Sequence, residues 1–156
     1  MKLSRFVDPG IARKKTIIES SLDYNRDFVV PAQIEISESG ICNRTCVFCP
    51  KSDPNYPNEA KFIDPMLVEK LTGELGELHY KGILVFSGFC EPLLDKNIFS
   101  LVQISRKNLP QAQIELVTNG DVLNVSRMRR LLDSGLSTLI ISAYDGEFQI
   151  TKFQDM

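Results

Sequence analysis

Short apolar segments alternate with amphipathic segments through most of this chain, and this alternation restricts its fold more than any other feature. Residues 33–37 (QIEIS) alternate polar and apolar side chains, which is typical of a half-buried strand, whereas residues 83–86 (ILVF) form a continuous apolar run, typical of a strand covered on both faces. Further strands are expected at 114–117 and 139–141, and helices at 98–108, at 125–133 and between Asp64-Pro65 and Gly82. Strands that alternate with helices predict a parallel sheet with right-handed crossovers.

The spacing of these units fits a βα barrel, so we predict an α/β fold that is a partial (β/α) barrel, truncated after its fourth strand. A fourth strand without a neighbour would expose its edge, which is a known liability. The alternative is a complete open sheet of four strands. Residues 32–156 are expected to form this core, and residues 1–31 an amino-terminal extension with a helix near 11–22.

Composition excludes several classes of protein. The 156 residues are 43% apolar and 24% charged, which are globular values, and they have room for one domain. A net charge of -2 gives no overall positive field, so neither nucleic acid nor a membrane surface is an expected partner. No apolar run approaches the ~20 residues of a membrane-spanning helix, and Met1–Gly10 lacks the apolar centre of a secretory signal. We therefore expect a cytoplasmic protein with reduced thiols.

Three of the four cysteines lie within eight residues, as Cys42, Cys46 and Cys49 in the spacing C-x3-C-x2-C. The first strand ends just before them, and loops at the carboxyl ends of parallel strands form ligand sites. Thiolates select zinc, copper(I) or iron–sulfur clusters. Zinc would need a fourth donor, for which Cys90 and His79 are candidates. A [4Fe–4S] cluster held by three cysteines would keep one iron open for chemistry.

The cysteine spacing, with an aromatic residue before the last cysteine, resembles the radical S-adenosylmethionine (radical SAM) superfamily. Residues 87–94 (SGFCEPLL), after the second strand, are similar to the family's glycine-glycine-glutamate-proline motif. Residues 118–120 (TNG) and 142–146 (SAYDG), after the third and fourth strands, resemble two further family elements. The resemblance covers roughly residues 32–146 and implies an enzyme with the partial barrel predicted above.

The resemblance also implies roles for individual residues. Cys42, Cys46 and Cys49 would bind three irons of a [4Fe–4S] cluster, and S-adenosylmethionine (SAM) would bind the fourth. The residues implied to contact SAM are Phe48 beside the adenine, Gly88, Phe89, Cys90, Glu91 and Pro92 around the methionine amino group, Asn119 in the third strand-end loop, and Ser142 at the ribose. An electron donor such as flavodoxin or ferredoxin would allow SAM to be cleaved to methionine and a 5′-deoxyadenosyl radical. That radical would abstract hydrogen from a peptide or small-molecule substrate.

Two positions depart from the family pattern, because Phe89 and Cys90 stand where the motif has glycines. Cys90 either packs under the loop or supplies a fourth metal ligand, and the latter would favour a zinc-stabilised binding module without catalysis. An electron-transfer ferredoxin fits less well, since a fourth cysteine is missing from the run. Glu91 is expected to hold its loop through backbone amides, to contact the ligand, or to be exposed. Residues 49–52 (CPKS) resemble members that continue into a cysteine-rich extension.

Overall fold

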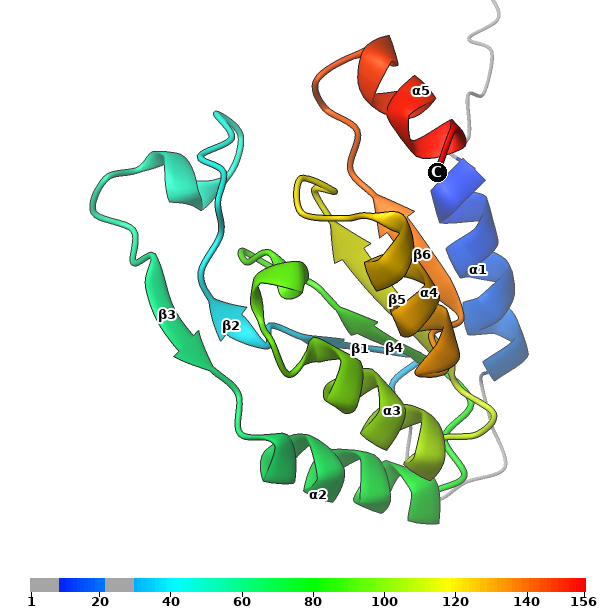
Figure 1. Ribbon diagram of the computed structural model, residues 1–156. Helices are drawn as coiled ribbons and strands as arrows, with labels where there is room; N and C mark the ends of the chain where they lie inside the picture. Colours follow the sequence, from blue (N-terminus) through cyan, green and yellow to red (C-terminus); the bar gives the residue numbers. More distant parts are fainter. Residues whose placement is uncertain (1–8, 22–29) are drawn as a thin grey trace, which may run out of the picture.

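Four parallel strands form the central sheet of the computed structural model, which describes residues 9–21 and 30–156 (Figure 1). They are β1 (Gln33–Ile36), β4 (Ile83–Phe86), β5 (Gln113–Thr118) and β6 (Thr138–Ile141), and they lie side by side in that order. Each neighbouring pair is parallel, with Ile34 opposite Leu84 and Leu116 opposite Leu139. The predicted α/β partial barrel is therefore confirmed, and the carboxyl ends of all four strands meet at one edge.

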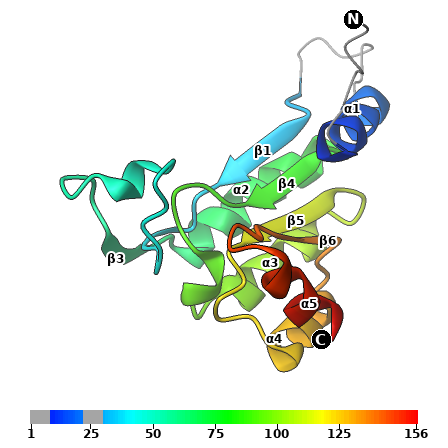
Figure 2. The same cartoon turned by 90° about the horizontal axis from the view of Figure 1, so that it is seen from above.

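Three helices cover one face of this sheet: α2 (Pro65–Glu77), α3 (Ile98–Asn108) and α4 (Val125–Asp133) (Figures 1 and 2). Alternate strand residues point towards them, so Leu84, Phe86, Ile114 and Leu116 join the core that these helices complete. Since the side chains on a strand alternate between faces, Glu115 points to the opposite face. The sheet thus separates a packed helical layer from the face that would line a barrel.

Helix α1 (Pro9–Ser21) reaches that second face through one ion pair. The Arg13 guanidinium donates two hydrogen bonds, of 2.6 and 3.0 Å, to the two carboxylate oxygens of Glu115. Glu115 is completely buried, whereas the Arg13 side chain is 36% exposed. Most of the helix expected near 11–22 is thus observed, and Leu22 falls outside the described residues. The last helix, α5 (Glu147–Gln154), follows β6.

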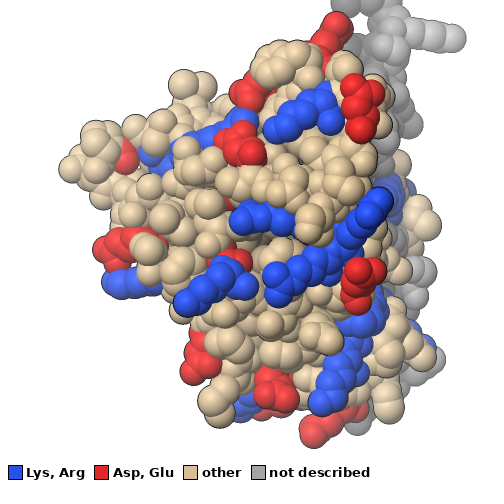
Figure 3. Space-filling view, in the orientation of Figure 1, with Lys and Arg blue, Asp and Glu red and all other residues tan. Residues whose placement is uncertain are grey.

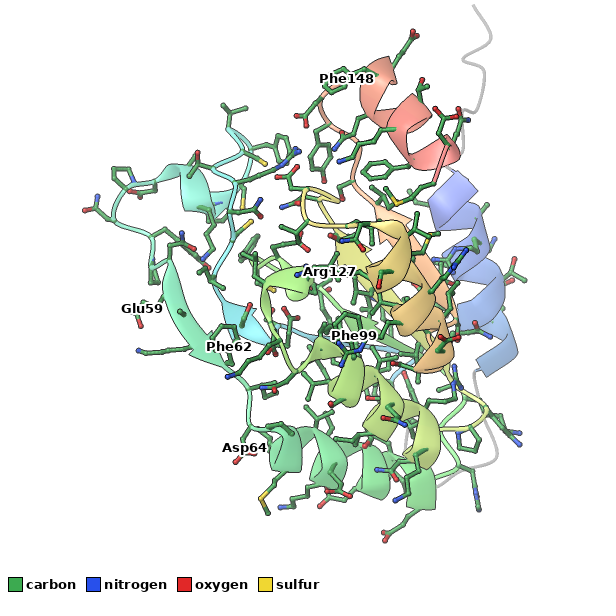
Figure 4. All side chains as sticks on the ribbon, viewed as in Figure 1. Glu59, Phe62, Asp64, Phe99, Arg127 and Phe148 are labelled. Carbon is green, nitrogen blue, oxygen red and sulfur yellow. The ribbon has the colours of Figure 1, made fainter. Side chains whose placement is uncertain are left out.

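The loop expected from Glu38 to about Ile63 contains regular structure, and in this respect the prediction was wrong. Strands β2 (Ser39–Gly40) and β3 (Glu59–Phe62) pair antiparallel, and the 3-10 turn η1 (Pro50–Ser52) lies between them. All four residues of β3 are exposed, so this strand has no buried apolar face by which its sequence would differ from that of a loop. Figure 4 shows Glu59 and Phe62 on this hairpin, away from the four-stranded sheet.

Helix α2 begins where its capping residue predicts, but two leucines that the helical spacing places on apolar faces, Leu67 of α2 and Leu132 of α4, are exposed. Asp64 caps α2 by accepting from the Met66 backbone N–H at 2.9 Å. The buried face of α2 consists of Val68, Thr72 and Leu75, whereas Leu67 is 56% exposed. Leu132 of α4 is likewise 53% exposed.

No helix in the described part of the chain is both long and apolar enough to cross a membrane.

Basic side chains cross the face covered by α3 and α4, with acidic side chains scattered around them (Figure 3). Two arginines of α4 make specific contacts on this face. Arg127 donates to the Leu93 carbonyl at 3.1 Å, and the Arg130 guanidinium lies 4.0 Å from the centre of the Phe99 ring (Figure 4). These arginines therefore attach α4 to its neighbours.

Candidate functional site

Loops from all four sheet strands meet at the carboxyl edge, and the cysteine loop lies among them. Its Ile41 carbonyl accepts a hydrogen bond of 2.9 Å from the Glu91 backbone N–H in the loop after β4. The Asn43 side chain accepts from Asn119, after β5, at 2.8 Å, and Arg44 donates to Asp145, after β6. The three sequence motifs after the second, third and fourth strands are thus brought against the cysteines.

The three thiols share one environment. Cys42, Cys46 and Cys49 are each partly buried and unpaired by disulfides. Burial raises the pKa of the Cys42 thiol, and the nearby charges of Glu91, Cys46 and Cys49 raise it further. The Arg44 backbone N–H points at the Cys42 sulfur from 3.5 Å and lowers that pKa. Cys42 thus lies within electrostatic reach of Glu91 and of the other two thiols.

A turn and a buried lysine shape the cysteine loop. The Cys49 N–H donates to the Cys46 carbonyl at 2.8 Å, and turn η1 follows directly. Lys51, only 6% exposed, donates to the carbonyls of Gly40 and Pro57 at 2.6 and 2.9 Å, and to the Asn58 side chain at 3.0 Å. All three donors of its ammonium are thus used to hold the loop to the β2–β3 hairpin.

Glu91, a residue only 1% exposed, joins the loops after β4 and β5 through its carboxylate. It accepts hydrogen bonds from the Leu93 N–H at 3.0 Å, the Thr118 hydroxyl at 2.6 Å and the Asn119 N–H at 2.8 Å. Burial raises the pKa of Glu91, while the three donors lower it. Of the three interpretations of Glu91, these contacts match the one in which the carboxylate holds the loop, and burial excludes an exposed side chain.

The loop after β4 also contains a glycine that its backbone conformation requires and an exposed aromatic ring. Gly88 has φ +119°, and a Cβ there would lie 2.1 Å from the Ser37 hydroxyl oxygen. Phe89 is 53% exposed and meets the Tyr56 ring edge to face at 6.0 Å. Pro92 is buried in the 3-10 turn η2 (Pro92–Leu94). Between this loop and the hairpin lies a cleft of about 260 Å³.

Cys90 packs beneath the loop beside the buried carboxyl group of Glu38. Its sulfur lies 3.4 Å from Glu38 Oε1 and 3.5 Å from the Ser87 carbonyl oxygen, the two acceptors available to its single S–H donor. Burial raises the pKa of Cys90 to about 12 and that of Glu38 to about 7. Glu38 Oε2 and Asp95 Oδ2 are buried without a hydrogen-bond partner among the described residues. This environment favours a protonated thiol, whereas a metal ligand must be a thiolate.

The remaining predicted residues face different surroundings. Asn119 is 8% exposed and uses its side chain within the protein, donating to Asn43 at 2.8 Å and accepting from the Asp121 N–H at 2.9 Å. Phe48 is 66% exposed and meets the Tyr144 ring edge to face at 4.9 Å. Ser142 is half-buried at the end of β6, where its N–H donates to the Thr118 carbonyl at 2.8 Å.

The donor set of the site limits which metal group it can hold. Among residues 9–21 and 30–156, no three His, Cys, Asp or Glu side chains gather closely enough to hold a single ion. His79 is exposed beyond the end of α2, at φ +53°. Zinc lies about 2.3 Å from each sulfur and draws its ligands tightly together, whereas a cubane of four irons takes its cysteines at separate corners. Three cysteine thiols are the donor set of a [4Fe–4S] cluster with one open iron, whereas zinc needs a fourth donor.

Residues 36–151 match the family profile of the Radical SAM superfamily. The chain belongs to the radical SAM superfamily. It is 33% identical, over 74% of its length and 46% of the relative's, to the S-adenosyl-L-methionine-dependent 2-deoxy-scyllo-inosamine dehydrogenase of Niallia circulans. This radical SAM chain thus spans about half the length of that relative.

Solved structures agree with this assignment. The crystal structure of BtrN in complex with AdoMet and 2-DOIA is 32% identical, with a TM-score of 0.70 over 76% of this chain and 48% of that one. Selenomethionine BtrN in an open conformation is 31% identical, with a TM-score of 0.68 over 80% and 55% of the two chains. The predicted superfamily and the partial barrel of this radical SAM chain are confirmed.

Proposed function

We propose that the cysteine loop binds a [4Fe–4S] cluster through Cys42, Cys46 and Cys49, and that the cluster and the adjoining loops bind SAM. The single observation that carries this proposal is the meeting of the three thiols with the Glu91 loop at one sheet edge. When bound and reduced, such a cluster supplies an electron that cleaves SAM to methionine and a 5′-deoxyadenosyl radical, which abstracts hydrogen from the substrate. Membership of the radical SAM superfamily supports this chemistry.

Different loops around the cysteines would bind different parts of SAM. Residues 88–92 form a loop that Glu91 holds in place, so its backbone carbonyls are fixed acceptors for the methionine ammonium. Phe48 and Ser142 would contact the adenine and the ribose from two sides of the same edge. Asn119 would act through Asn43 and the loop, because its side chain already has protein partners. Phe89 and Cys90 would contribute their backbone, with Cys90 pointing under the loop.

For the whole protein we propose an oxidoreductase that acts on a small molecule rather than on a peptide. Its similarity to a dehydrogenase of 2-deoxy-scyllo-inosamine supports this choice. The electron donor would be a flavodoxin or a ferredoxin. The competing zinc-stabilised module would need Cys90 as a thiolate, and the contacts of Cys90 with Glu38 and Ser87 oppose this.

Anaerobic reconstitution of the chain with iron and sulfide tests the proposal. We expect about four iron and about four sulfide ions per chain, with loss of both in Cys42→Ala, Cys46→Ala and Cys49→Ala. Cys90→Ala is the matched control and should keep its iron. Addition of SAM and dithionite should then release 5′-deoxyadenosine, measured by chromatography. One zinc ion per chain without sulfide, lost in Cys90→Ala, would contradict the proposal.

A further inference from the structure

Arg44 lies between the first two cysteines and makes more contacts with distant loops than any thiol does. Its Nε and Nη2 donate to the two carboxylate oxygens of Asp121 at 2.7 and 2.5 Å. Its Nη1 and Nη2 donate to the two carboxylate oxygens of Asp145 at 3.1 and 2.6 Å. Asp121 follows β5 and Asp145 follows β6, 77 and 101 residues away in the sequence. One guanidinium thus connects three strand-end loops.

The geometry requires an arginine. Arg44 uses four of the five N–H groups of its guanidinium, in two bidentate pairs. A planar guanidinium can present both pairs at once, whereas a lysine ammonium is a point donor and pairs fully with one carboxylate. The Arg44 side chain is 17% exposed, against 32% for Asp121 and 43% for Asp145, so the pairs are partly shielded from water.

Neighbouring contacts connect the same loops independently of Arg44. Asn43 donates to Asp121 Oδ2 at 2.8 Å. Phe48, between the second and third cysteines, meets Tyr144 edge to face at 4.9 Å, and Tyr144 precedes Asp145 in the chain. The cysteine loop has almost no regular structure of its own between β2 and η1, so its shape depends on these contacts. The Arg44 backbone N–H also points at the Cys42 sulfur from 3.5 Å, so the residue that makes the ion pairs also contacts one of the thiols.

We propose that Arg44 is a positioning residue, which fixes the cysteine loop against the loops after β5 and β6 and so places the three thiols before any cluster binds. The inference rests on the proposed function for its purpose, but the contacts of Arg44 that carry it are made with protein residues alone. Asp121 and Asp145 are its partners, and neither contacts a thiol in the structure. Removal of the guanidinium should loosen the cysteine loop, which keeps its Asn43, Phe48 and Lys51 contacts, and should leave the sheet and its helical layer in place.

Alkylation of the metal-free chain by iodoacetamide, under reducing anaerobic conditions and with peptide mapping, measures this release. In Arg44→Met we expect Cys42 to react about tenfold faster than in the wild type, corresponding to about 1.4 kcal/mol. Loss of a positive charge by itself raises the pKa of a nearby thiol and slows alkylation, so a faster reaction reports opening of the loop. Arg44→Lys should lie between the two, and Cys90, beneath the loop, should keep its rate.

Arg129→Met is the matched control, because it removes the same charge from an exposed position on α4. It should leave all four thiols at their wild-type rates. In the wild type, raising the salt from about 0.05 M to about 1 M should screen the ion pairs and speed the reaction of Cys42, whereas Arg44→Met should respond little. A Cys42 rate in Arg44→Met within about twofold of the wild type, with an unchanged circular dichroism spectrum, would overturn the proposal.

If Arg44→Met does not fold, Asp145→Asn tests the proposal instead, since it weakens only the more exposed of the two ion pairs of Arg44. It should speed the alkylation of Cys42 about threefold, and an unchanged rate would refute the role of Arg44. Iron uptake separates this inference from the proposed function. If alkylation depends on Arg44 but the wild-type chain takes up no iron and sulfide, the positioning role holds and the proposed cluster is wrong.

Discussion

Replacing Glu38 by glutamine should remove the part of the pH dependence of the free energy of unfolding that the titration of Glu38 causes. Glu38 is completely buried, accepts from the thiol of Cys90 and has one carboxylate oxygen without a described partner. Burial raises its pKa from the ordinary 4.5 to about 7. Its folded state therefore holds the proton more tightly than its unfolded state does.

The direction and size of the effect follow from this difference. Between pH 4.5 and about 7 the folded chain binds more protons at Glu38 than the unfolded chain, so the free energy of unfolding falls as the pH rises through this window. A rise from 4.5 to about 7 corresponds to about 3 kcal/mol. Glutamine keeps an acceptor for Cys90 but does not titrate. Asp95, whose pKa burial also raises, titrates in both proteins.

Urea unfolding followed by circular dichroism at pH 5 and pH 8, on the metal-free reduced chain, measures the difference. Between these values the wild type should lose about 3 kcal/mol more stability than Glu38→Gln. Glu69→Gln, at an exposed position on α2, is the control and should keep the wild-type profile. Equal losses in Glu38→Gln and the wild type would show that Glu38 is already ionised in the folded chain, and the burial argument would fail.

Three further substitutions test the packing of the site and of the sheet in the same unfolding assay. Gly88→Ala should cost about 1–3 kcal/mol, because φ is +119° and the new Cβ would meet Ser37; a cost near zero would mean that the loop rearranges freely. Glu91→Ala should cost about 3–5 kcal/mol, since three buried donors lose their acceptor, and an unchanged urea midpoint would contradict this. Arg13→Met should cost about 1–3 kcal/mol by leaving Glu115 buried without its ion-pair partner. This loss is smaller than that in Glu91→Ala because Arg13 is partly exposed. Equal stability of Arg13→Met and the wild type at neutral pH would show that the contact of α1 with the sheet contributes nothing.

Sequence patterns were sufficient where burial and local chemistry determine the structure. The apolar run of β4 is buried at every position, and Asp64 caps α2 as its place before a proline suggests. Both signals depend on residues close in sequence. The β2–β3 hairpin escaped prediction because β3 buries no side chain, and four alternating residues (EAKF) are too few to distinguish a strand from a loop. Leu67 was placed on the wrong face of α2, since Val68 and Thr72 define the face that packs against α3.

The polar residues of the site also fall into two groups, those that the sequence predicts and those that only the fold reveals. The cysteines and Glu91 stand out because a recognised motif gives them a role, whereas Lys51 and Arg44 stand at positions to which the motifs assign none. In the sequence each is one more basic residue in a polar loop, and a solvated side chain is the usual expectation. Their importance depends on partners that only the fold supplies, such as the two carboxylates 77 and 101 residues beyond Arg44.

The two cations hold the cysteine loop from opposite sides, and they do so with different chemistry. Lys51 is bound by three uncharged oxygens at the hairpin, so its positive charge stays uncompensated among its hydrogen-bond partners. Arg44 faces two carboxylates, so its cluster carries surplus negative charge. Since a buried polar group is stable only when its hydrogen bonds are satisfied, each network specifies one conformation of a segment that has little apolar packing of its own. A loop anchored at both flanks can present three thiols in a defined arrangement, while the segment between the anchors stays exposed enough to receive a ligand.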